Sequence, residues 1–151
     1  MIRALTVHLV VRDAARAAAW YVRALGATEV GRIAVPGGKF MQIELRFGDS
    51  TVMLADEFPE AGVVGPETLG GSPGAFHLLT DDVEALWTSA IAAGGKELQP
   101  LVERFWGERF GQLVDPFGHR WNLAQRVREV PRAEVARAAW EAFGGDPHGS
   151  P

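Results

Sequence analysis

Two histidines stand at matching points of two similar stretches of the sequence and are the first candidates for chemistry: His8 and His77. Together with Glu44 they could offer two imidazole nitrogens and one carboxylate to a divalent metal. A histidine beside a carboxylate can also act as a general base. The spacing, however, does not place three ligands at about 2.0–2.2 Å from one point. We therefore expect His8 and His77 to line a pocket, where each donates a hydrogen bond to a ligand or stacks on it.

The composition excludes several other classes of chemistry. The 151 residues include no cysteine, which rules out disulfides, thiolate metal sites and a thiol nucleophile. A net charge of −4 offers no basic footprint for nucleic acid. No apolar run approaches the roughly 20 residues of a membrane span, and the N-terminus lacks the apolar stretch of a signal peptide. These features predict a soluble, cytoplasmic protein that handles a small molecule or another protein and binds neither nucleic acid nor membrane.

An internal repeat indicates which elements position these side chains. The residues that recur 69 positions later are His8 as His77, Asp13 as Asp82, and Gly26 as Gly95. Further along, the offset becomes 70, and Phe40 and Gln42 recur as Phe110 and Gln112. Matches at so many points over half a chain indicate two copies of one module.

Each module has the pattern of a strand, a helix and three more strands. In the first, apolar alternation predicts a strand over Ala4–Val11, with Leu5 on the side that faces the helix. The other predicted elements of that module are a helix from an Asp13 cap to Gly26 and strands near Thr28–Ile33, Phe40–Phe47 and Ser50–Glu57. The second module repeats them as a strand at Gly74–Leu79, a helix from an Asp82 cap to Gly94, and strands near Glu97–Arg104, Glu108–Val114 and Arg120–Arg126.

The domain organisation follows from these elements. Residues 1–57 form the first βαβββ module and residues 74–127 the second, and residues 58–73, rich in proline and glycine, form a linker. Pro131 opens a C-terminal helix within residues 128–143. Residues 144–151 are expected to be a disordered tail. We thus predict an α+β fold in which two modules form an open, eight-stranded, barrel-like cleft.

Side chains on the strand faces turned away from the helices should line this cleft. We expect the ligand-binding residues to be His8, Phe40, Gln42, Glu44, Met53, His77, Trp106, Phe110, Gln112 and Asn122. Trp106 is included because it sits beside Phe105 in a glycine-containing turn, where an apolar pair would otherwise be exposed. Phe40 and Phe110 are repeat partners that either flank the cleft or plug the core.

Several short motifs make the chain similar to a known family. They are Val11–Ala15, Phe47–Ser50, Met53–Pro59, Leu69–Pro73, Phe105–Arg109 and Asp115–Trp121, the last of which contains DPFGH before the final strand. With the βαβββ duplication, they resemble the vicinal oxygen chelate superfamily, which includes glyoxalase I, bleomycin-resistance proteins and extradiol dioxygenases. The PhnB-like branch is the most similar. The resemblance covers about residues 4–135 and implies a homodimer with pockets at or near the subunit interface.

The resemblance also places the metal ligands of the superfamily, which are His and Glu side chains at four equivalent strand positions. In this sequence those positions hold Thr6, Met53, Ala75 and Asn122. This set offers neither the imidazole nitrogens nor the carboxylate oxygens that a divalent ion prefers. The chain is similar in this respect to the bleomycin-resistance proteins, which sequester a drug without metal or reaction.

We therefore predict a binding protein with no cofactor and no catalytic residues, which sequesters an aromatic or polycyclic compound such as an antibiotic. Trp106, Phe40 and Phe110 would stack on the ligand, and the polar residues of the predicted set would supply hydrogen bonds. The alternative is a metal-dependent lyase, isomerase or dioxygenase of the same superfamily, with a displaced metal on His8, His77 and Glu44.

Overall fold

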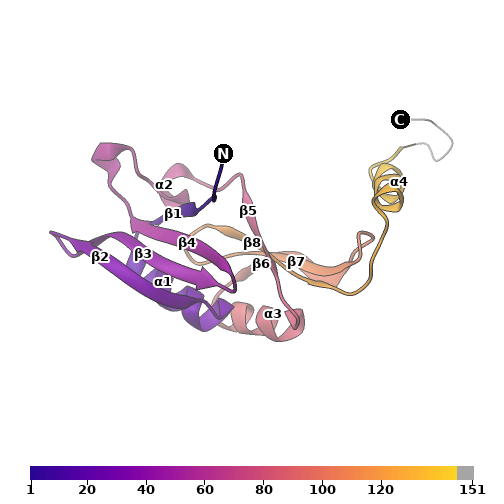
Figure 1. Cartoon of the computed structure of the whole chain (residues 1–151), viewed down its shortest axis with the longest axis horizontal. Coiled ribbons are helices and arrows are strands. Elements are labelled where there is room, and N and C mark those ends of the chain that lie inside the picture. Colours follow the sequence, from indigo (N-terminus) through magenta and orange to yellow (C-terminus); the bar gives the residue numbers. More distant parts are fainter. Residues whose placement is uncertain (146–151) are drawn as a thin grey trace.

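The structure, a computed structural model, describes residues 1–145 and consists of two βαβββ modules followed by a helix (Figure 1). The first module contains β1 (Val7–Val11), α1 (Ala14–Leu25), β2 (Thr28–Val35), β3 (Lys39–Phe47) and β4 (Ser50–Asp56). A connecting segment holds the short helices η1 (Pro59–Ala61) and α2 (Pro66–Leu69). The second module contains β5 (Ala75–Leu79), α3 (Val83–Ala92), β6 (Lys96–Glu103), β7 (Glu108–Val114) and β8 (Arg120–Arg126), and α4 (Arg132–Ala142) follows.

Each module forms its own four-stranded mixed sheet. The strand orders are β1-β4-β3-β2 and β5-β8-β7-β6, so the two sheets have the same topology. In each sheet the first strand pairs in parallel with the last, and the other pairs are antiparallel. The predicted α+β duplication is confirmed. The eight strands form two sheets and not a closed barrel.

Equivalent side chains begin both long helices. Asp13 accepts a hydrogen bond from the Arg16 amide at 3.0 Å, and Asp82 accepts one from the Ala85 amide at 3.1 Å. Both are the predicted N-caps, and Gly26 ends α1 in the left-handed conformation at φ 71°. The repeat therefore extends to individual backbone hydrogen bonds.

The core lies between each sheet and its helix. Leu9, Val11 and Leu54 are at most 2% exposed, as the alternation of the first module predicts. The prediction for Leu5 is wrong: this side chain is 90% exposed. The pairing of β1 with β4 begins only at Val7, so the residues before it leave the sheet. Apolar alternation predicts which side of a strand is buried, but it does not supply a pairing partner.

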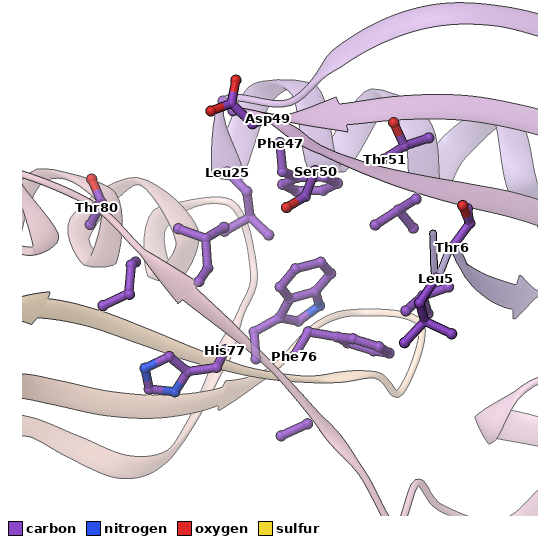
Figure 2. Close-up of a pocket in the computed structure, with 18 of the residues that line it drawn as sticks. Leu5, Thr6, Leu25, Phe47, Asp49, Ser50, Thr51, Phe76, His77 and Thr80 are labelled. Carbon is purple, nitrogen blue, oxygen red and sulfur yellow. The ribbon is translucent and has the colours of Figure 1, made fainter. Parts of the chain in front are cut away.

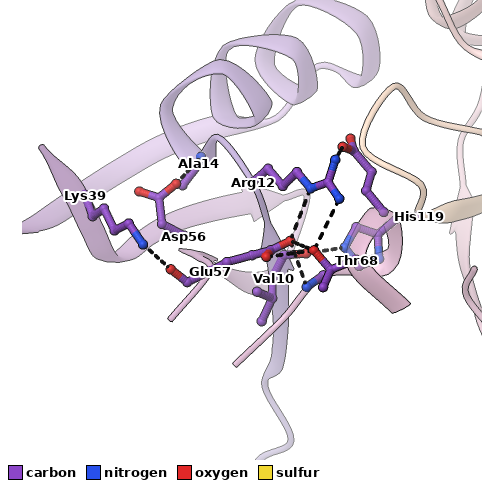
Figure 3. Close-up of polar contacts among 10 residues, drawn as sticks. Val10, Arg12, Ala14, Lys39, Asp56, Glu57, Thr68 and His119 are labelled. Carbon is purple, nitrogen blue, oxygen red and sulfur yellow. Dashed lines mark hydrogen bonds and ion pairs between the residues drawn. The ribbon is translucent and has the colours of Figure 1, made fainter. Parts of the chain in front are cut away.

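The connecting segment is more ordered than a plain linker. Pro59 and Pro66 each open a short helix, which is the position in a helix that proline favours. Figure 3 shows how the segment is fastened to the first module: the Thr68 hydroxyl donates to the Glu57 carboxylate at 2.7 Å, and Arg12 lies 3.7 Å from the same carboxylate. This segment therefore packs on β1 and β4 through polar contacts.

A buried carboxylate joins the two modules. Asp115, which is 4% exposed in the turn before β8, accepts hydrogen bonds from the Tyr21 hydroxyl of α1 at 2.5 Å and from the Trp121 indole at 2.9 Å. The amides of Phe117 and His119 donate to its other oxygen at 2.8 and 3.0 Å. All four donors are ordered by one side chain, so Asp115 determines how α1 meets the second module.

Burial of the Tyr21 side chain raises its pKa well above the ordinary value of 10.0, and the negative charge of Asp115 raises it further. The neutral hydroxyl is the form that can donate to Asp115. Tyr21 is also the only tyrosine of the chain.

The C-terminal helix is confirmed and stands away from both sheets (Figure 1). Of the predicted tail, residues 146–151 lie outside the described residues. No helix within residues 1–145 is both long and apolar enough to cross a bilayer.

We expect Asp115→Ala to lower the free energy of unfolding by about 3–5 kcal/mol, because it leaves buried donors without an acceptor. Tyr21→Phe removes one hydroxyl and should lower the free energy of unfolding by about 1 kcal/mol. Urea titration followed by tryptophan fluorescence measures both values. A loss for Asp115→Ala no larger than that for Tyr21→Phe would contradict the central role of the carboxylate.

The raised pKa of Tyr21 predicts a loss of stability at alkaline pH. Tyrosine in the unfolded chain ionises near pH 10. Because the folded state keeps its proton to higher pH, stability is complete below about pH 10 and falls as the pH rises toward the pKa of the folded state. Absorbance at the tyrosinate band reports this one residue. Native protein should show no tyrosinate near pH 10, and Tyr21→Phe should lose less stability between neutral and alkaline pH than the wild type does.

Candidate functional site

The face of the second sheet turned away from α3 carries a cluster of polar and aromatic side chains. Strand register places His77 of β5 beside Asn122 of β8, and Asn122 beside Gln112 of β7. Side chains alternate along a strand, so Phe110 and Glu108 of β7 lie on the same face as Gln112. Trp106 reaches this face from the β6–β7 turn. We call the six residues His77, Trp106, Glu108, Phe110, Gln112 and Asn122 the module-two cluster.

Hydrogen bonds run through the cluster in one direction. Gln112 Nε2 donates to Asn122 Oδ1 at 2.8 Å, and Asn122 Nδ2 lies 3.4 Å from His77 Nδ1. His77 Nε2 lies 3.2 Å from the Glu108 carboxylate. With the Asn122 amide as donor, His77 Nδ1 is the acceptor and Nε2 carries the proton. In this arrangement the amides orient His77 so that its Nε2–H donates to Glu108.

One aromatic side chain stacks on the same histidine, and a second packs against the first. The rings of Phe110 and His77 stack with centroids 5.8 Å apart, and the Trp106 ring meets Phe110 edge-on at 5.3 Å. Trp106 Nε1 donates to Glu108 Oε2 at 2.9 Å. The guanidinium of Arg104 lies 5.5 Å from the centre of the Phe110 ring. Two N–H groups thus occupy the Glu108 carboxylate, and an apolar surface lies beside it.

Sequence reasoning missed Glu108 and Arg104. The signal for Glu108 was present, because it lies two and four residues from Phe110 and Gln112 and so shares their face. Arg104 directly follows β6, just before the turn, and its direction depends on packing against Phe110, which spacing does not reveal.

The equivalent face of the first module is less organised. The register places His8 beside Met53, and Met53 beside Glu44, the same row as His77, Asn122 and Gln112. Met53 takes the place of the central amide, so no relay can form through it. Within residues 1–145, His8, Gln42 and Glu44 make no side-chain hydrogen bond or ion pair. We call His8, Gln42, Glu44 and Met53 the module-one face.

Phe40 and Phe110, the repeat partners, have different surroundings. Phe40 packs against the hydrophobic core, with the Arg32 guanidinium 4.8 Å from its ring centre. Phe110 is 8% exposed but contacts His77 and Trp106 of the cluster. Five of the ten predicted ligand-binding residues therefore come together in module two: His77, Trp106, Phe110, Gln112 and Asn122.

The residues present do not fit a divalent metal. The positions that carry ligands in the superfamily hold Thr6, Met53, Ala75 and Asn122, which offer no imidazole or carboxylate. Among the described residues, no group of three or more His, Asp or Glu side chains is placed to hold an ion. His8, His77 and Glu44 are accordingly not brought together within one chain.

Two cavities adjoin the cluster. One, of about 990 Å³, lies between the modules, and His77 lines it together with the aromatic side chains Phe47, Phe76 and Trp121. In Figure 2, Leu5 and Thr6 lie on one side of this cavity and Thr80 on the other. The second, of about 560 Å³, lies beside Trp106 and Glu108. His77 of the cluster thus lines the first cavity, and Trp106 and Glu108 line the second.

Comparison with known proteins supports the fold and the family. The protein Mb0911c of Mycobacterium bovis is 44% identical to this chain over 138 residues, which are 89% of this chain and 91% of that protein. The structure of TioX from Micromonospora sp. ML1 is 26% identical, with a TM-score of 0.64, and the match covers 83% of this chain and 99% of TioX. A PhnB protein from Bacillus cereus, titled a putative 3-demethylubiquinone-9 3-methyltransferase, is 16% identical with a TM-score of 0.64, over 82% of this chain and 99% of its own.

The family model described as "Glyoxalase/Bleomycin resistance protein/Dioxygenase superfamily" matches residues 3–123, which include β1 to β7 and the first part of β8. The duplicated βαβββ topology is the fold that the motifs predicted. The chain therefore belongs to the glyoxalase/bleomycin resistance protein/dioxygenase superfamily.

Proposed function

We propose that this protein sequesters a small aromatic or polycyclic molecule, such as an antibiotic, in the cytoplasm, without a metal and without a reaction. The observation that carries the proposal is the module-two cluster, where Trp106 and Phe110 lie beside hydrogen-bonding groups. Rigid aromatic side chains with a few polar groups are the usual make-up of a small-molecule site.

The hydrogen-bond pattern favours binding over catalysis. Both nitrogens of His77 already have partners, Asn122 and Glu108, and both oxygens of Glu108 lie within 3.3 Å of N–H groups of the cluster. A general base needs a free lone pair that faces the substrate. The polar groups therefore hold the aromatic surface in place, and Trp106, which is only partly buried, offers it to a ligand.

We further propose that two chains form a symmetric dimer, as the resemblance implies. β1 and β5 are edge strands of their sheets, and within residues 1–145 neither has a partner on its outer side. Leu5, just before β1, is 90% exposed and Leu79 of β5 is 54% exposed. Such edges are usually covered in native proteins. A second copy that covers them would bring its module-one face opposite the module-two cluster and close the cleft.

We expect Trp106→Ala to weaken the binding of a planar apolar probe, N-phenyl-1-naphthylamine, at least tenfold, because the variant removes the exposed aromatic wall. Fluorescence titration gives the dissociation constant. Trp140→Ala, which removes a tryptophan from α4, is the matched control and should leave the affinity unchanged. Unchanged affinity in Trp106→Ala would remove that residue from the site. If neither this probe nor a panel of aromatic antibiotics binds or raises the melting temperature, the proposed function is wrong.

For the dimer, sedimentation equilibrium of the wild type should give twice the chain mass of 16.3 kDa. The double variant Leu5→Glu, Leu79→Glu should raise the dimer dissociation constant at least tenfold, because it buries two charges at the interface. Leu98→Glu changes a leucine of similar exposure, 45%, on β6 at the far edge of the second sheet and should have no effect. A wild-type protein that sediments as a monomer would refute this arrangement.

A further inference from the structure

The cavity of about 560 Å³ is lined by an arginine side chain, Arg126, that no group within residues 1–145 neutralises. Its lining includes Trp106 and Glu108 of the cluster, together with Arg126 at the end of β8. Arg126 is exposed and, within residues 1–145, makes no side-chain hydrogen bond or ion pair. The other arginine of the lining, Arg128, is bound to Glu103 at 3.1 Å.

Arg126 lacks a partner although a carboxylate lies directly across from it. Strand register pairs Arg126 with Glu108, and opposite charges at such a position normally attract. Glu108 instead accepts from Trp106 Nε1 at 2.9 Å and lies 3.2 Å from His77 Nε2. The cluster thus takes up the carboxylate and leaves the guanidinium of Arg126 available to the cavity.

The connector that follows β8, from Arg128 to Pro131, lines the cavity and is held in place by backbone hydrogen bonds. The amides of Val127 and Arg128 both donate to the carbonyl oxygen of Gly107, at 3.0 and 3.2 Å. Gly107 has φ +94°, and a Cβ atom there would lie 2.4 Å from the Arg128 carbonyl oxygen. Only glycine allows the turn and the connector to approach so closely. The connector from Arg128 to Pro131 therefore forms a fixed side of the cavity.

This cavity lies partly outside the common family fold. The family match ends at residue 123, whereas Arg126 and the connector follow it. The carboxylate of Glu129 also lines the cavity, so the cation is not the only charge there. Arg126, however, lies opposite Glu108 in the register of β7 and β8, and it lines the cavity together with Trp106.

We propose that the ligand carries an acidic group, a carboxylate, sulfonate or phosphate, that binds Arg126 while its planar part contacts Trp106. This inference rests on the proposed function and specifies the chemistry of its ligand. A planar guanidinium binds such an oxyanion through two parallel hydrogen bonds.

A matched pair of probes tests the proposal. 8-Anilinonaphthalene-1-sulfonate and N-phenyl-1-naphthylamine share one aromatic framework, but only the first carries a sulfonate. We expect the wild type to bind the sulfonate at least fivefold more tightly. Arg126→Gln should abolish that preference and leave the affinity for the neutral probe within twofold of the wild type. Glu129→Gln should increase the affinity for the sulfonate, because it removes the opposing charge.

Arg120→Gln is the control, because Arg120 lies on the same strand and the same face, is exposed, and lines neither cavity. It should keep the preference for the sulfonate. If both probes bind through Trp106 but Arg126→Gln does not change the preference, the anion site is wrong and the proposed function stands. If neither probe binds, this inference fails, and the proposed function fails with it when the panel of aromatic antibiotics does not bind either. Urea midpoints confirm that each variant is folded.

Discussion

The arrangement of the two modules depends on one buried carboxylate. Asp115 brings together a helix of the first module, through Tyr21, and the last strand of the second, through Trp121. A charge in this position would be costly unless each of its oxygens had donors, and all of its donors are supplied locally or by Tyr21. At the equivalent place in the first module, the turn before β4, the chain has Gly48 and Asp49, which are exposed. The Asp115 contacts are thus particular to the second module, and they orient the two modules relative to each other.

The duplication has given two similar backbones with different surfaces. Both helices begin with an aspartate cap, and both sheets have the same strand order. The faces opposite the helices have diverged: a row of His, Asn and Gln in module two supports a hydrogen-bond relay, whereas Met53 interrupts the same row in module one. Asn122 and Met53 are also two of the positions where the superfamily holds a metal. Amide and thioether side chains at these positions suit an organic ligand better than a divalent ion.

The repeat predicted the fold well because the apolar periods and caps are local in sequence. The elements agree with the predicted ranges to within a few residues, apart from the first strand, which lacks a partner before Val7. The short helices of the connecting segment were missed, because a composition rich in proline and glycine indicates turns but does not show which backbone groups pair within them. The site was predicted in part. Strand alternation placed His77, Phe110, Gln112 and Asn122 on one face, but the role of Glu108 depends on which of two neighbours its side chain reaches, and that is decided by packing.

The close approach at Gly107 separates the choice of ligand from the stability of the fold, two properties that usually change together. The connector it holds lies beyond the duplicated modules and shares no core with them. Under the proposed anion site, substitutions at exposed positions such as Glu129 would alter which ligand the cavity prefers while leaving the buried core of both sheets unchanged. A lineage of such proteins could exchange one ligand for another by changing a few residues at this rim, while the glycine and the two modules stay constant. The two modules would thus keep their fold while the residues of the connector change.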